Sequence, residues 1–378
     1  IAGTLTTGSG GLAIDPPNTI TITGSLSSTG AISLDANDQI TIGGNVIASD
    51  TLSIDSDADS TGGGNIQLGS VTLQSGNAMT LAVGTSEALN LTGADSTTAT
   101  ITAGGATLAL PDLTDTNNPN LTVSTTGNIT LGTADLGTGT HSFTVDSDNN
   151  SSGTLLASGE LTLGAATLSG GGSGTNDTLD INGNITAGTL TIQNVNSVDF
   201  AGANLTASGG DLLVSTNVTT FSLSGVSDVT LEANGEGAIF LADITSGVNV
   251  SLDIRAEGSV TAGSININGG NLSIDSDDDN DSNAAGVTAG ALTANQVDIS
   301  AGSDANDDIS LTGDVNSSTS ITIDNASKVD LAANVDLTAG NGSLSISSNV
   351  GSVNLAGGDG STNILTANGE GDISLASL

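Results

Sequence analysis

The chain has 378 residues, of which 41 are acidic and only two are lysine or arginine, so its formal net charge at pH 7 is −39. A surface this acidic repels nucleic-acid phosphates and anionic lipid headgroups, which argues against binding to either partner. Cysteine is absent, so disulfides and thiolate metal sites are excluded, and no apolar run reaches the roughly 18–20 residues of a membrane span.

Short alternating segments recur along the whole chain, about every 20–25 residues. Apolar residues occupy every second position, which predicts strands with one set of side chains inside and the other in water. In chain order, the eight most alike are 32–35, 52–55, 121–124, 143–146, 190–193, 272–275, 321–324 and 344–347. We interpret these eight as variants of one repeated strand, each packing mainly on its neighbours.

The same alternation predicts further strands, because β-branched Ile, Val and Thr favour an extended backbone. In chain order they are 19–23, 39–42, 70–73, 79–83, 98–102, 128–131, 229–231, 249–252 and 264–267. Long helices are not expected, since the chain has 53 glycines and glycine costs about 1 kcal/mol per helical position relative to alanine. Turns are marked by Gly and Asn, as at Gly43-Gly44, Gly104-Gly105 and Gly183-Asn184, where we expect positive φ angles.

The rarity of aromatic residues favours a narrow core. An antiparallel sandwich would need aromatic filler, and the chain has only four aromatic residues, all phenylalanine. The sequence therefore predicts an all-β, single-stranded parallel β-helix, or β-solenoid, with about 17 coils of roughly 20–25 residues stacked into an elongated rod. Residues 1–378 are expected to form one continuous solenoid, and because repeat-like sequence reaches both ends, we expect it to be a segment of a longer chain.

Three Asp-rich inserts interrupt the repeat, near 55–64, 146–153 and 275–283. Each begins with Asp-Ser-Asp after an apolar residue, which predicts the same corner of the coil each time. Two of them alternate carboxylates that suit Ca²⁺, a cation that prefers oxygen ligands. The candidate ligands are Asp55, Asp57, Asp59, Asp275, Asp277 and Asp279. The alternative is a solvated acidic loop; no cofactor is required, and calcium is the one candidate.

The segments Gln39–Ile54 and Gly183–Ile192 show the recurrent texture G-x-I-T-L-x-G-x-V-x-A-G-x-L-x-I. This texture, which covers nearly the whole chain, resembles the haemagglutination-repeat β-helices of filamentous haemagglutinin-like exoproteins and large bacterial surface adhesins. The resemblance implies secretion, an extracellular or cell-surface location, and an adhesive or fibrous role.

Enzymatic chemistry finds little support. His141 is a lone histidine just before a strand, and we predict a surface position for it. Arg255 and Lys328 sit among acidic residues, which predicts local ion pairs; the alternative is that they fix contacts between subunits. The Thr-x-Thr runs at 19–23 and 98–102 are too sporadic for the repeated threonine array of an ice-binding solenoid, so we interpret them as ordinary strand residues.

We therefore expect a structural extracellular protein and not an enzyme. The first hypothesis is a rod segment of an adhesin, or the subunit of a cell-surface filament that assembles head to tail through its open strand edges. The second is a calcium- or ligand-binding surface module that contacts a host, matrix or carbohydrate surface. The third is a carbohydrate-active β-helix enzyme, which would need a carboxylate pair facing a groove beside Arg255.

Overall fold

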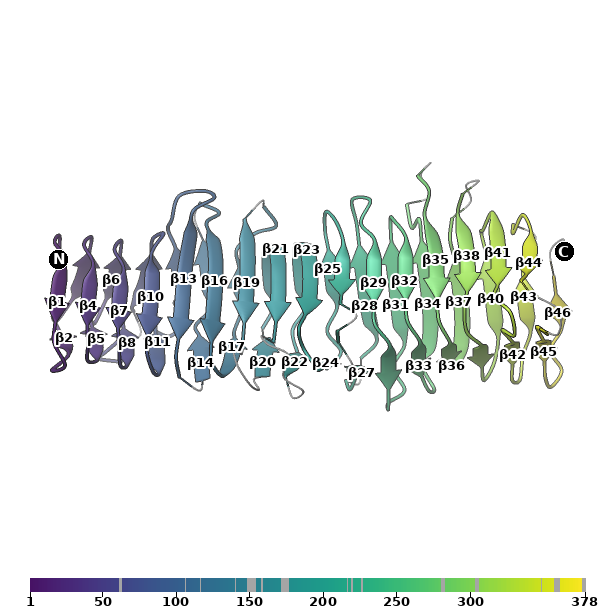
Figure 1. Cartoon of the computed structure of the whole chain (residues 1–378), viewed down its shortest axis with the longest axis horizontal. Helices are drawn as coiled ribbons and strands as arrows, with labels where there is room; N and C mark the ends of the chain where they lie inside the picture. Colours follow the sequence, from purple (N-terminus) through teal and green to yellow (C-terminus); the bar gives the residue numbers. More distant parts are fainter. Residues whose placement is uncertain are drawn as a thin grey trace. The chain divides into compact units, whose positions relative to one another are not determined.

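The structure is a computed structural model of the chain. It describes residues 1–60, 63–105, 107–115, 117–139, 141–147, 154–157, 159–170, 177–215, 217–218, 220–225, 227–279, 283–302, 306–347, 349–356 and 361–375. Throughout these residues the regular elements are short β-strands and none is a helix (Figure 1). The predicted all-β, parallel β-solenoid is therefore confirmed.

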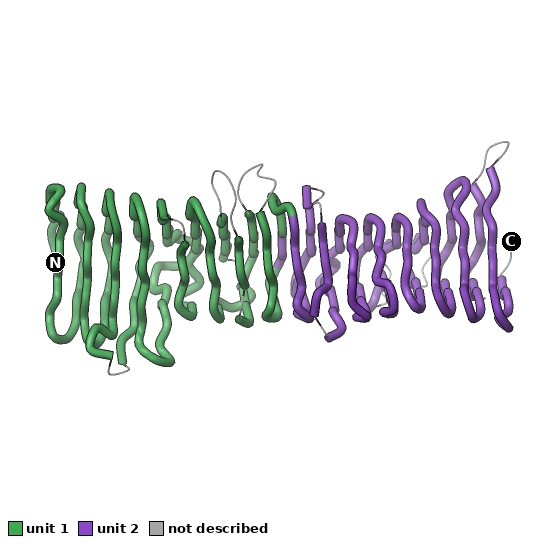
Figure 2. The backbone as a smooth tube through the Cα atoms, turned by 90° about the horizontal axis from the view of Figure 1, so that it is seen from below, with its two compact units in different colours: residues 1–188, 192–196 green, residues 189–191, 197–378 purple. Residues whose placement is uncertain are grey.

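The chain divides into two compact units. Unit 1 comprises residues 1–188 and 192–196, and unit 2 comprises residues 189–191 and 197–378 (Figure 2). Within each unit the chain winds through successive coils, and strands pair in parallel with their counterparts in the next coil; the described pairings have one break, between Met79–Ala82 and Thr107–Leu110. Three strands per coil build three faces around a narrow core.

The first face in unit 1 consists of β1 (Leu5–Thr7), β4 (Leu26–Ser28), β7 (Val46–Ala48), β10 (Thr72–Ser75), β13 (Thr98–Ala103), β16 (Asn120–Thr125), β19 (Ser142–Asp146) and the second half of β21 (Leu161–Ser169). In unit 2 it consists of β26 (Leu212–Val214), β29 (Ile239–Leu241), β32 (Val260–Ala262), β35 (Gly286–Ala289), β38 (Asp308–Leu311), β41 (Lys328–Leu331) and β44 (Val353–Leu355). β23 (Ile185–Gln193) has residues in both units, and its residues Thr189–Thr191, which belong to unit 2, precede β26 on this face.

The second face in unit 1 consists of β2 (Leu12–Ile14), β5 (Ile32–Asp35), β8 (Leu52–Asp55), β11 (Met79–Ala82), β14 (Thr107–Leu110), β17 (Asn128–Leu131), β20 (Thr154–Ala157) and β22 (Thr178–Ile181). In unit 2 it consists of β24 (Ser197–Phe200), β27 (Thr220–Leu223), β30 (Ile244–Ser246), β33 (Ile265–Ile267), β36 (Leu292–Ala294), β39 (Val315–Ser317), β42 (Leu337–Ala339) and β45 (Leu365–Ala367).

The third face in unit 1 consists of β3 (Thr19–Ile22), β6 (Gln39–Ile42), β9 (Asn65–Leu68), β12 (Leu89–Leu91), β15 (Leu113–Asp115), β18 (Ala134–Asp135) and the first half of β21. In unit 2 it consists of β25 (Leu205–Ala207), β28 (Val229–Ala233), β31 (Leu252–Ala256), β34 (Asn271–Ser276), β37 (Gln296–Ser300), β40 (Ile321–Asp324), β43 (Leu344–Ile346) and β46 (Ile373–Ser374).

The core follows directly from the period-two pattern. Inward residues of neighbouring coils are stacked in register, as where Ile20 and Ile22 of β3 pair with Ile40 and Ile42 of β6, and all four are buried. Stacked aliphatic side chains exclude water and favour the folded chain by about 25 cal/mol per Å² of apolar surface buried.

Coil length varies more than the repeat suggested. Thr19 pairs with Gln39, twenty residues later, whereas Leu344 pairs with Ile373, twenty-nine residues later. Because some coils are longer than expected, the number of coils is smaller. In the described chain the second face has one strand per coil and eight strands in each unit, so the total is slightly below the 17 coils expected.

The eight alike segments are strands, but they are not one repeated strand. Segments 32–35 and 52–55 belong to the second face, and 121–124 and 143–146 belong to the first face. In unit 2, segments 272–275, 321–324 and 344–347 belong to the third face. Each face needs the same in–out alternation, so the sequence pattern cannot tell the faces apart.

The expectation that the three inserts share one corner of the coil is also wrong, because strands of all three faces have the same alternating pattern. The inserts at 55, 146 and 275 follow β8, β19 and β34, which belong to the second, first and third faces respectively. What they share is a serine that points inward at the end of the strand, since Ser56, Ser147 and Ser276 are all fully buried. The Asp-Ser-Asp pattern therefore marks the end of a strand and not a particular face.

Most of the turn glycines do not have the positive φ that we expected. Gly44, Gly104 and Gly183 have ordinary φ angles, and a Cβ at each would lie 2.0–2.1 Å from a backbone carbonyl oxygen of the preceding coil. Glycine is needed there because successive turns stack in close contact, which leaves no room for a side chain. Among the glycines that mark turns, Gly235 and Gly269 do have the expected positive φ.

Many acidic residues have a structural role at the start of a strand. Asp314 Oδ1 accepts a hydrogen bond from the backbone N–H of Asp336, the equivalent position in the next coil, at 2.9 Å. Asp336 Oδ1 in turn accepts from the N–H of Ile364 at 2.9 Å. The same bond recurs at Asn45, Asp112, Asn120, Asn128, Asn204, Asp211, Asp228 and Asp243. These side chains therefore link neighbouring coils near the start of the strands, in addition to the backbone hydrogen bonds between paired strands.

This role is testable by comparing two substitutions at one position. Asp314→Ala is expected to lower the free energy of unfolding by about 1 kcal/mol relative to Asp314→Asn, because only the amide oxygen can still accept the Asp336 N–H. Both variants remove one negative charge, so the difference between them isolates the hydrogen bond. Urea unfolding followed by circular dichroism measures it, and equal midpoints for the two variants would contradict the structural role.

The register also corrects our view of the threonines. On the first face of unit 1, Thr72, Thr100, Thr122, Thr144 and Thr167 occupy one outward position in five successive coils. They are not sporadic; they were hidden because they are separated in sequence by whole coils. The adjacent outward column contains Gln74, Thr102, Ser124 and Asp146, so only one of the two columns is threonine.

Candidate functional site

The carboxylates at 55–59 form a turn at the end of β8. Asp55 and Asp57 are partly exposed and Asp59 is exposed. The backbone N–H of Asp57 donates to Asp55 Oδ1 at 3.0 Å, so at least one Asp55 oxygen serves to shape the turn. Residues 61–62 of this insert lie outside the described residues.

The carboxylates at 275–279 point in different directions. Asp275, on β34, pairs in register with Arg255 and Ser300, and burial raises its pKa although the Ser300 hydroxyl opposes that shift. Asp277 is 3% exposed with a φ of 61°, whereas Asp279 is exposed. The three carboxylates occupy alternate positions, but the alternation breaks after Ser276: Asp277, with its positive φ, is buried, whereas Asp279 lies in water.

Calcium binding therefore remains a prediction. Across the described residues, no group of three or more His, Cys, Asp or Glu side chains is placed to hold a metal ion. Residues 148–153 and 280–282, which belong to the other two inserts, lie outside the described residues.

The two cations form the local ion pairs that the sequence predicted. Arg255 contacts Asp253 at 2.5 Å, and Lys328 contacts Asp330 at 2.7 Å. Lys328 also contacts Asp308, from the neighbouring coil, at 3.4 Å. The hydrogen bonds with Asp253 and Asp330 raise the pKa of Arg255 and Lys328 respectively. Exposed pairs of this kind contribute little stability, and they leave each cation neutralised by its neighbours.

The surface position predicted for His141 is wrong. Its side chain is 1% exposed, and its Nε2 accepts a hydrogen bond from the backbone N–H of Gly164 at 3.1 Å. Burial lowers the pKa of His141, while the nearby carboxylates of Asp115 and Asp95 oppose that shift. Burial also raises the pKa of Asp115. His141 directly precedes β19 and has the same phase as its inward residues Phe143 and Val145, so the period-two alternation continues to the histidine.

The buried histidine predicts a pH-dependent contribution to stability. The pKa of His141 is lowered from 6.5 on folding, so below about pH 6.5 the unfolded chain binds a proton that the folded chain does not. Wild type should therefore lose stability relative to His141→Gln as pH falls from 7.5 to 5.5, by at most about 1.4 kcal/mol per pH unit. Thermal unfolding of both proteins across this range measures the difference. The raised pKa of Asp115 has the opposite effect on stability: the folded chain protonates this carboxyl more readily than the unfolded chain, so a lower pH favours folding through Asp115.

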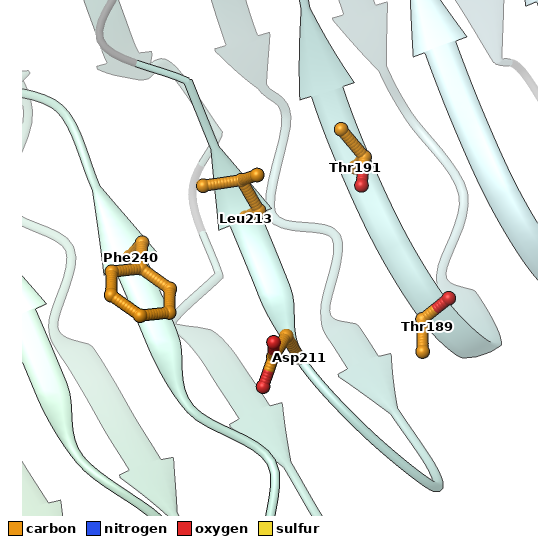
Figure 3. Close-up of a pocket in the computed structure, with 5 residues that line it drawn as sticks. All are labelled: Thr189, Thr191, Asp211, Leu213 and Phe240. Carbon is orange, nitrogen blue, oxygen red and sulfur yellow. The ribbon is translucent and has the colours of Figure 1, made fainter.

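A shallow groove lies on the outer surface of the first face in unit 2 (Figure 3). It encloses about 460 Å³ and is lined by Thr189, Thr191, Asp211, Leu213 and Phe240. Leu213 of β26 and Phe240 of β29 lie side by side in register, and both are the outward residues of their strands. Their exposed fractions are 36% and 40%.

The groove was missed in the sequence, although a signal was present. Leu212-Leu213-Val214 and Ile239-Phe240-Leu241 each contain three consecutive apolar residues, so the central one must face outward in an alternating strand. The two runs are 27 residues apart, which is one coil, and the register places their central residues together. An apolar residue at an outward position was the feature to look for.

Comparison with known proteins does not assign a function to the groove or to the acidic inserts. No protein-family description, curated protein or solved structure matches the chain. The described part of the chain also contains no helix long and apolar enough to cross a lipid bilayer.

Proposed function

We propose that the protein is a structural, extracellular module: a rod segment of a surface adhesin, or the subunit of a cell-surface filament that assembles head to tail. The β-solenoid fold, whose coils stack by parallel pairing within each unit, supports a structural repeat role. The two basic residues of the chain offer few sites for trypsin-like proteases, which suits an extracellular location. We propose no catalytic role.

The observation behind the filament is the exposure of apolar residues on two edge strands. In unit 1, Leu5 of β1 continues the inward column of Leu26, but Leu5 is 36% exposed whereas Leu26 is fully buried. In unit 2, Leu355 of β44 continues the column of Leu331 and is 47% exposed, whereas Leu331 is fully buried. Leu5 and Leu355 thus lie on β1 and β44, the edge strands of the first face among the described residues, beside backbone groups that no other described strand pairs.

The two edges are complementary to each other and not to themselves. A parallel ladder continues only when the edge at one end meets the edge at the other end, so association between copies is head to tail. Such a contact between unlike surfaces does not close on itself and generates an open fibre. The occupant proposed for each edge is a second copy of this chain.

The test is association of the purified chain. Sedimentation velocity and negative-stain electron microscopy are expected to show end-to-end oligomers that lengthen with concentration. Leu5→Lys should abolish them by placing a charge at the contact, whereas Val248→Lys, at a position 36% exposed elsewhere in unit 2, should not. Single particles at every concentration would overturn the proposal of a filament.

A further inference from the structure

Phe240 is unlike the other aromatic residues of the chain. The chain has four phenylalanines, and Phe143, Phe200 and Phe221 are fully buried in the core. Phe240 is 40% exposed, at the centre of the groove on unit 2. Covering exposed apolar surface is favourable, and Phe240 and Leu213 together line one groove, so this pair of outward residues is a candidate contact for a ligand.

Polar groups that suit hydroxylated ligands surround the ring. Thr189 and Thr191 line one side of the groove, and Asp211 lies at its end (Figure 3). Asp211 is held in place because its Oδ1 accepts the backbone N–H of Ala238 at 2.9 Å. One apolar platform, Phe240 with Leu213, is thus flanked by two hydroxyls and an oriented carboxylate. Sugar rings have this same division, with C–H groups on their faces and hydroxyls at their edges.

The hollow surface continues beyond the groove along the same face. Thr261 of β32 is paired with Phe240, and it also lines a second hollow over β32, β35 and β38. That hollow is lined further by Ser259, Gly286, Thr288 and Ser310. At about 4.8 Å per strand, the seven strands from β23 to β41 span roughly 29 Å. A surface of this length suits a chain of several sugar rings and exceeds what a monosaccharide needs.

The charge of the surface selects among glycans. Asp211 lies in the groove, and Asp308 and Asp330 line the second hollow. The cation on this face, Lys328, is already paired with Asp308 and Asp330. Uronic acids, sulfated sugars and other anionic polymers would meet like charge, which is strongly unfavourable.

We propose that the outer first face of unit 2 binds a linear, neutral polysaccharide, with one sugar ring stacked on Phe240 and Leu213 and its hydroxyls bonded to Asp211, Thr189 and Thr191. This binding site goes beyond end-to-end assembly and does not depend on it. The contact requires no metal and no chemical step.

The experiment is affinity electrophoresis of the full chain in native gels that contain hydroxyethyl cellulose, laminarin or galactomannan, with polygalacturonate as the anionic comparison. Wild type should be retarded by at least one neutral polymer and not by polygalacturonate. Phe240→Ala should bind at least about tenfold more weakly, because the stacking surface is lost. Phe240→Tyr keeps the ring and should stay within about threefold of wild type.

The matched control is Val248→Ala, which trims another apolar residue of unit 2 that is 36% exposed but lies outside the groove. It should bind like wild type, and circular dichroism establishes that each variant is folded. The proposal is overturned if no neutral polymer retards the protein, if Phe240→Ala and Val248→Ala bind alike, or if polygalacturonate binds equally well. A change in oligomeric state of Phe240→Ala without polysaccharide binding would also overturn it, and would identify the patch as a contact between copies.

Discussion

Phe221→Ala is expected to lower the free energy of unfolding by about 3–5 kcal/mol, the largest effect of any single substitution considered for this protein. Phe221 is fully buried on β27, and its ring lies 4.6 Å from that of Phe200, with 34° between the ring planes. The substitution removes most of the side chain and leaves a cavity. The surrounding strands are fixed by pairing on both sides, so they cannot close the cavity easily.

The chain supplies its own control for this prediction. Phe240→Ala makes the same chemical change on a side chain that is 40% exposed, and it should cost less than about 1 kcal/mol. Urea unfolding followed by circular dichroism compares the two variants with wild type. Similar losses for both variants would contradict the assignment of Phe221 to the core and Phe240 to the surface.

Gly183→Ala is the second large effect, with an expected loss of roughly 3 kcal/mol in the free energy of unfolding. A Cβ at Gly183 would lie 2.0 Å from the carbonyl oxygen of Gly159 and 2.3 Å from its carbonyl carbon. Both atoms belong to the backbone of the stacked turn, so relief of the clash requires the two coils to separate. Gly159 is under the same constraint, since its own Cβ would lie 2.6 Å from the backbone of Gly132.

Gly188→Ala is the matched control, five residues away in the same unit. A Cβ there would meet its nearest neighbours at 3.5 Å, an ordinary van der Waals distance. Its φ lies outside the left-handed region, so alanine is expected to be neutral or to stabilise by up to about 1 kcal/mol through the unfolded chain. Thermal unfolding compares Gly183→Ala with Gly188→Ala. If Gly188→Ala were the less stable variant, close stacking of the turns would not be the reason that glycine is needed.

The strands were predictable because alternation is a local property. β5, β8 and β40 begin and end where the sequence pattern places them. The segment 249–252 was placed too early, since β31 runs from Leu252 to Ala256. There, Leu252, Ile254 and Ala256 face inward and Asp253 and Arg255 face outward, so the alternation continues beyond the predicted end of the segment.

The candidate sites were harder to predict. The acidic inserts were selected because alternating carboxylates suit Ca²⁺, but in this chain several aspartates make structural hydrogen bonds instead, as at Asp314 and Asp336. The groove depends on Leu213 and Phe240, which are 27 residues apart and become neighbours only through the register of β26 and β29. His141 was placed on the surface because it is polar, although it shares the phase of the inward residues Phe143 and Val145.

The sequence by itself determined the class of protein: an all-β parallel solenoid, with an aliphatic core and strands of alternating polarity. Period-two alternation and backbone propensity act within a few residues, so they can be read along the chain. Only the tertiary structure decided which face each strand joins, because all three faces require the same alternation. The register between coils likewise decided which glycines must lack a side chain, which threonines align, and that Phe240 meets Leu213 in an exposed groove.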